Sequence, residues 1–182
     1  MRVTFTRLPD HEWGSVLIER DDHVVYRMGA GPMTAELPHD LVHFTVEDAL
    51  RISDGIWGAI AGGVVFRSMT HVSGRRPPHA AERSAELIRT HRDRLQRAEL
   101  IGGFVEAAAA GDDIGALYRQ WFATQTDPVP VAEVSRAVAA LHAAEARWGA
   151  LAIGAELTLE WPGTRRLTPP PTKREAVRRR GR

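Results

Sequence analysis

Two histidines and two acids fall on one side of a predicted helix near residue 40. Residues 39–47 read His-Asp-Leu-Val-His-Phe-Thr-Val-Glu. Each helical residue turns by about 100°, so His39, Asp40, His43 and Glu47 share an arc of roughly 100°. The rest of the circumference is mostly apolar. This pattern predicts a largely buried helix with one narrow polar stripe.

Histidines four residues apart on a helix can bind the same metal ion, and the pattern resembles the His-Glu-x-x-His helix of zincin metalloproteases. We interpret His39 and His43 as ligands of zinc or another divalent ion. Asp40 stands where zincins carry their general base, so it is the candidate catalytic residue, although its side chain is one methylene shorter. Glu47 is either a further ligand or a carboxylate that orients an imidazole.

A zincin-like site needs a third ligand from elsewhere in the chain. Glu82, Glu86 and His91, all in a later predicted helix, are the candidates. The competing interpretation is that the stripe is only the solvent-exposed face of an amphipathic helix. The protein would then be a non-catalytic domain that packs against a partner or forms a homo-oligomer, with a basic tail as a tether.

The elements that must position this stripe are strands at both ends of the chain and helices in the middle. Residues 13–20 and 23–28 predict a hairpin around Asp21-Asp22, and residues 2–7 alternate like a short strand. Residues 151–161 predict a final strand. Because a lone hairpin is marginal, we expect residues 156–161 to pair antiparallel with residues 2–7.

Helical periodicity accounts for most of the middle of the chain. The predicted helices cover about 38–53, 55–66, 79–110, 114–123 and 131–148, with a loop at 67–78. The expected fold class is α+β: a small antiparallel sheet, made of the N-terminal strands and the C-terminal strand, covered on one face by about four helices.

Composition indicates one domain of ordinary hydrophobicity in a chain of 182 residues. Residues 163–182 carry a net charge of +7 and lack an apolar pattern, so we expect a single domain over residues 1–162 followed by a disordered tail. Residues 1–162 carry −6, which argues against a nucleic-acid-binding domain. Nucleic acid or an anionic surface would be contacted only through the tail. The chain has no cysteine, and its first residues lack the apolar run of a secretion signal, which favours the cytoplasm.

Two segments, LPHDLVHFTVE (37–47) and WGALAIGAELTLEW (148–161), resemble a group of actinobacterial proteins that are usually labelled hypothetical. The resemblance implies no activity, ligand or cofactor. It does imply that the two segments belong to one structural unit, in agreement with the predicted pairing of the final strand.

Overall fold

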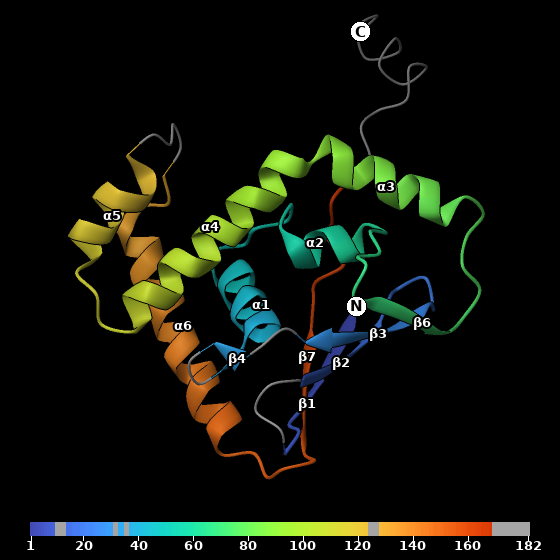
Figure 1. The fold of residues 1–182 in the computed structure, drawn as a ribbon, viewed down its shortest axis with the longest axis horizontal. Coiled ribbons are helices and arrows are strands. Elements are labelled where there is room, and N and C mark those ends of the chain that lie inside the picture. Colours follow the sequence, from blue (N-terminus) through green and yellow to red (C-terminus); the bar gives the residue numbers. More distant parts are fainter. Residues whose placement is uncertain (10–13, 31–32, 35–36, 124–127, 169–182) are drawn as a thin grey trace, which may run out of the picture.

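In a computed structural model, the described part of the chain forms a five-stranded antiparallel sheet on one side and six helices on the other (Figure 1). The structure describes residues 1–9, 14–30, 33–34, 37–123 and 128–168. Trp13 of the predicted hairpin and residues 169–182 of the predicted tail lie outside the described residues. The α+β fold class is confirmed, and the described residues form six helices where about four were expected.

The sheet has the strand order β6-β3-β2-β1-β7. Its strands are β1 (Arg2–Thr6), β2 (Gly14–Glu19), β3 (Val25–Ala30), β6 (Met69–Ser73) and β7 (Glu156–Glu160). The predicted hairpin is formed by β2 and β3, and β7 pairs antiparallel with β1 in the register Val3↔Leu159. A separate two-stranded ribbon joins β4 (Met33–Thr34) to β5 (Leu37–Pro38), directly before the first helix.

The two faces of the sheet differ as alternation along the strands requires. Val3 and Phe5 of β1 are buried towards the helices. Thr4 lies on the opposite face, where its hydroxyl is 3.0 Å from that of Thr158 on β7. The predicted loop at 67–78 is wrong in its middle, because β6 pairs with β3 there. Four of the five β6 residues are exposed, so this edge strand has no apolar alternation to reveal it.

The helices are α1 (His39–Ala49), α2 (Ile56–Ala61), α3 (Ala80–Thr90), α4 (Arg92–Ala109), α5 (Ile114–Phe122) and α6 (Val131–Gly149). Helix α1 lies at the centre, in contact with α2, α4 and α6 (Figure 1). Its Phe44 meets Phe5 of the sheet edge-to-face, with ring centroids 6.2 Å apart, and Trp57 of α2 at 5.2 Å. This aromatic cluster anchors α1 to the sheet.

The single helix expected over residues 79–110 is wrong, because the chain bends at His91 and divides into α3 and α4. His91 has φ −111° and ψ 22°, which is not helical. The bend lets the two segments pack differently. Ser84 of α3 bonds both backbone groups of Val65, whereas the buried side of α4 packs against α1 and α6.

Residues 163–168 belong to the predicted tail, but the structure places them against α1 and α2. The Arg165 guanidinium lies 2.5 Å from the Asp48 carboxylate. Leu167 is buried, and its N–H donates to the carbonyl of Gly58. The chain therefore continues beyond β7 as a packed segment up to residue 168.

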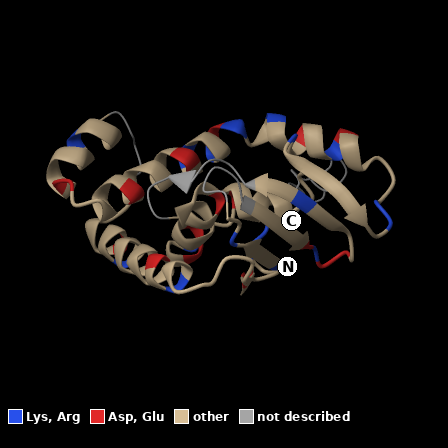
Figure 2. Ribbon diagram, turned by 60° about the horizontal axis from the view of Figure 1, so that its bottom comes forward, with Lys and Arg blue, Asp and Glu red and all other residues tan. Residues whose placement is uncertain are grey.

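Acidic and basic residues are interspersed along the helices (Figure 2). Helix α3, for example, carries Glu86 and Arg89 as an ion pair of 2.6 Å. Within the described part of the chain, no helix is both long enough and apolar enough to cross a membrane.

Candidate metal centre

His39 and His43 come together because α1 begins at His39. Pro38 precedes the first turn with φ −58°, and Asp40 is the acidic residue of that turn. One helical turn separates the two histidines, so their rings stack edge-on with centroids 4.5 Å apart. The predicted spacing therefore produces a real pair of imidazoles.

Helix α4 adds a carboxylate to this pair. Glu99 Oε2 lies 3.2 Å from His43 Nε2 and 3.7 Å from His39 Nε2. One ligand atom from each of the three residues lies within 4.8 Å of the others. A tetrahedral ion with bonds of about 2.0–2.1 Å places its ligand atoms roughly 3.3 Å apart. The two nitrogen–oxygen distances are close to this value, so the three side chains could hold one small ion.

His43 is the buried member of the site, with 3% of its side chain exposed. Neither of its ring nitrogens has a well-directed hydrogen-bond partner among the residues that the structure describes. A buried polar group in this state points to strain, to a functional role or to an ion or water that belongs there. Gly102 on α4 makes room for the ring, since a Cβ at this position would lie 2.7 Å from His43 Cε1.

Glu47 continues the stripe one turn beyond His43, and 1% of its side chain is exposed. Its carboxyl group accepts the N–H of Ile56 on Oε1 at 2.8 Å and that of Trp57 on Oε2 at 3.0 Å. These are the first N–H groups of α2, which lack partners within that helix. Glu47 Oε1 is also 3.9 Å from His43 Nδ1. The structure therefore places Glu47 near Nδ1 of His43, whereas Glu99 lies at Nε2 of the same ring.

The electrostatics divide the site into two parts. The contacts with His39 and His43 hold the pKa of Glu99 well below its usual range, and the contact with Glu99 raises the pKa of His39. Burial raises the pKa of Glu47 to about 8, against the effect of its two backbone hydrogen bonds. Glu99 is therefore the ionised carboxylate of the cluster, while Glu47 is held in a low-dielectric environment.

Asp40 lies on the histidine side of α1, where its carboxylate raises the pKa of His39. Its carbonyl oxygen accepts the indole N–H of Trp57 at 3.2 Å. Asp40 is thus adjacent to the cluster, as the helical arc predicts.

The three residues that the sequence suggested as a third ligand do not join His39 and His43. Glu82 and Glu86 line a separate cavity of about 490 Å³ beside α3, which Arg20 and Tyr26 also line. His91 lies at the bend between α3 and α4. The residue that joins the histidines is Glu99, which the sequence reasoning missed. One feature of the sequence could have pointed to this part of the later helix: the adjacent glycines Gly102-Gly103. Glycine is unfavourable inside a helix, so its presence there indicates that another group packs closely against the helix backbone.

Comparisons with known proteins do not identify the site: no family model matches the chain, and no curated protein and no solved structure matches it.

Proposed function

We propose that this protein binds a divalent metal ion, Zn²⁺ in the first instance, through His39, His43 and Glu99. The observation that carries the proposal is the buried ring of His43. Its nitrogens lack well-directed partners among the described residues, and Nε2 faces Glu99 Oε2 at 3.2 Å. An ion bound there would compensate the buried imidazole, which is a good zinc ligand when neutral.

The donor set supports a catalytic type of site. Two histidines and one glutamate leave a fourth position of a tetrahedral ion to water, as in catalytic zinc sites. The buried His43 separates the site from solvent on the side of the core. The side chain of Glu99 is 52% exposed, so the site is open to solvent there. A metal ion in such a site lowers the pKa of its bound water, and we assign Asp40 as the residue that would accept the proton.

Calorimetric titration of the metal-free protein with Zn²⁺ tests the binding. We expect one ion per chain for the wild type and loss of that binding in His43→Ala, because two ligands from one helical turn act together. Glu99→Gln should weaken the binding by at least tenfold, since the charged ligand is lost. Equal weak heats for the wild type and His43→Ala would refute the proposal.

Matched controls come from residues of the same type outside the site. His71→Ala changes an exposed histidine on β6, and Glu86→Gln changes an exposed glutamate that pairs with Arg89. Both variants should bind Zn²⁺ as the wild type does. A parallel loss in the controls would mean that the heats report scattered surface sites.

The proposed hydrolytic activity is tested separately, with p-nitrophenyl acetate as the substrate. Zinc-loaded wild type should cleave the ester faster than the metal-free protein. Asp40→Asn should retain the zinc and lose this difference, if Asp40 accepts the proton. Zinc binding without any acceleration would leave a metal-binding protein and remove the hydrolytic role.

A further inference from the structure

We propose that Glu47 is the positioning residue of this metal centre: it holds the ring of His43 so that Nε2, and not Nδ1, binds the ion. The inference rests on the proposed metal site and assigns Glu47 a role other than that of a ligand. It follows from the placement of His43 between Glu47 on one side and Glu99 on the other.

The two nitrogens of the His43 ring face different acids. Nε2 is 3.2 Å from Glu99 Oε2, within the metal-competent group, whereas Nδ1 is 3.9 Å from Glu47 Oε1. Binding of an ion at Nε2 requires that Nδ1 carry the proton. Glu47 Oε1 is the acceptor that faces this N–H, at a separation that a shift of about 1 Å would reduce to hydrogen-bond length. Metal-binding histidines commonly donate their second N–H to a carboxylate in this way.

Glu47 is itself held in place from three directions. The N–H groups of Ile56 and Trp57 bind its two oxygens. Gly55 lies directly against the carboxyl group, since a Cβ there would be 2.5 Å from Glu47 Cδ. The Trp57 indole N–H also bonds α1 at the Asp40 carbonyl, so α2 cannot slide freely over α1. The start of α2 therefore fixes the carboxyl group that faces His43.

Gly102 of α4 lies directly against the same ring. A Cβ at this position would meet all three nearest ring atoms of His43 at 2.7–3.2 Å. The imidazole is thus confined by the backbone of α4 and by the Glu47 carboxyl group, with little freedom to rotate. This confinement fixes which nitrogen faces Glu99.

Two variants test the role of Glu47 without changing a ligand. Glu47→Gln keeps the size of the side chain but replaces one acceptor oxygen with an NH₂ group. Gly55→Ala displaces the carboxyl group from behind. Each should raise the Kd for Zn²⁺ by about 10- to 100-fold, the usual effect of losing a carboxylate that supports a metal-binding histidine.

Gly58→Ala is the matched control on the same helix. Its Cβ would meet the Ser53 carbonyl oxygen at 2.1 Å, so it disturbs the docking of α2 without touching Glu47. If Glu47 acts on His43, Gly58→Ala should change the Kd much less than Gly55→Ala does. Equal losses in the two variants would mean that α2 affects the site only through general stability, and would overturn the inference.

The nitrogen that binds the metal can be read directly from ¹⁵N chemical shifts of the histidine rings in the zinc-loaded wild type. We expect Nε2 ligation with a proton on Nδ1 for His43. Ligation through Nδ1, or a Kd of Glu47→Gln within twofold of the wild type, would overturn the role of Glu47 while leaving metal binding intact. Failure of the wild type to bind Zn²⁺ would instead refute the metal site itself.

Discussion

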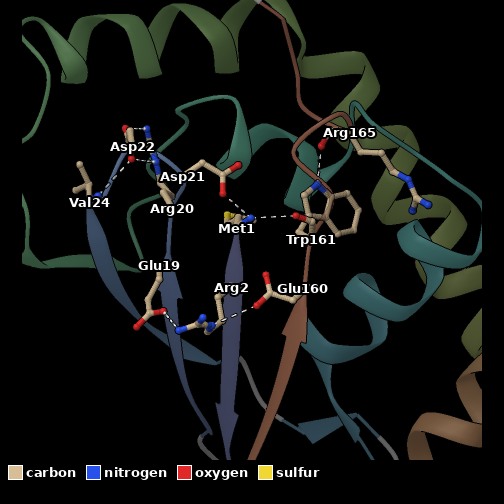
Figure 3. A network of polar contacts seen from close by, with 10 residues as sticks. All are labelled: Met1, Arg2, Glu19, Arg20, Asp21, Asp22, Val24, Glu160, Trp161 and Arg165. Atoms are coloured by element: carbon tan, nitrogen blue, oxygen red, sulfur yellow. Dashed lines mark hydrogen bonds and ion pairs between the residues drawn. The ribbon is translucent and has the colours of Figure 1, made fainter.

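Two polar clusters lie beside the same hydrophobic core and differ in how their groups are satisfied. At one end of the sheet, the Met1 ammonium donates to the Trp161 carbonyl at 3.0 Å and pairs with Asp21 at 2.7 Å (Figure 3). The Trp161 indole N–H in turn donates to the Arg165 carbonyl at 2.5 Å. Between α1 and α4, by contrast, the buried His43 ring has no well-directed partner among the described residues.

The difference separates structural polarity from a candidate site. The Met1 network joins β1, the turn after β2 and the segment after β7, and each charged group in it faces an opposite charge or a hydrogen-bond partner. Such a network specifies the fold. The His43 cluster leaves both nitrogens of one buried imidazole without a well-directed hydrogen bond among the described residues, an arrangement that costs stability and is more common at functional sites.

The largest expected effect comes from removing the strand on which the first cluster depends. A chain that ends at Gly154 lacks β7 and Trp161, so β1 loses one of its two neighbouring strands and becomes an exposed edge. We expect an unfolded or insoluble product, measured by circular dichroism and by sedimentation of the expressed protein. A soluble, cooperatively melting product would show that β7 is dispensable.

The cluster around His43 should make the free energy of unfolding depend on pH. Burial raises the pKa of Glu47 to about 8, so the folded state binds a proton more tightly than the unfolded chain, where a glutamate titrates near 4.3. The free energy of unfolding should therefore fall as the pH rises from about 4.3 to about 8, by roughly 1 kcal/mol per pH unit.

Glu47→Gln should remove most of this slope in urea unfolding of the metal-free protein. The comparison with the variant is necessary because the raised pKa of His39 also lowers stability as the pH rises from about 6.5, where an unfolded histidine titrates, towards that raised pKa. Parallel pH profiles for the variant and the wild type would contradict the buried, proton-binding state of Glu47.

A smaller effect is expected from the segment that follows β7. A chain that ends at Pro162 lacks the Arg165–Asp48 ion pair and the buried Leu167. Loss of one buried leucine costs about 1.5–3 kcal/mol, so this chain should melt at a clearly lower temperature. A chain that ends at Thr168 keeps both contacts and is the control. Identical melting of the two chains would show that residues 163–168 contribute nothing.

The smallest effect is expected from Asp21→Asn. The variant removes the ion pair with Met1 but keeps an acceptor oxygen and the bond from Met1 to Trp161. Because the Asp21 side chain is 59% exposed, we expect a loss of at most about 1 kcal/mol in urea unfolding, and less at high salt. A loss comparable to the Pro162 truncation would mean that this pair anchors β1 far more strongly than a solvent-exposed pair does.

Much of the secondary structure follows from local patterns. The hairpin of β2 and β3, the start of α1 at His39 and the pairing of residues 156–161 with residues 2–7 were all predictable from alternation, turn residues and proline. Strand β6 could not be predicted from the sequence, because most of its residues are exposed and its sequence shows no alternation of polar and apolar residues. It is a strand because it pairs with β3.

The candidate site divides in the same way. Helical geometry places His39, Asp40, His43 and Glu47 on one arc whatever surrounds them, because residues three and four apart always share a face. The partners of that arc depend on contacts between residues far apart in the chain. Glu99 reaches the histidines because α4 bends away from α3 at His91 and approaches α1 where Gly102 leaves space. Glu47 turns to α2 because that helix has unpaired N–H groups at its start. Periodicity is a property of neighbouring residues, whereas the packing of helices is decided by the complementarity of whole surfaces.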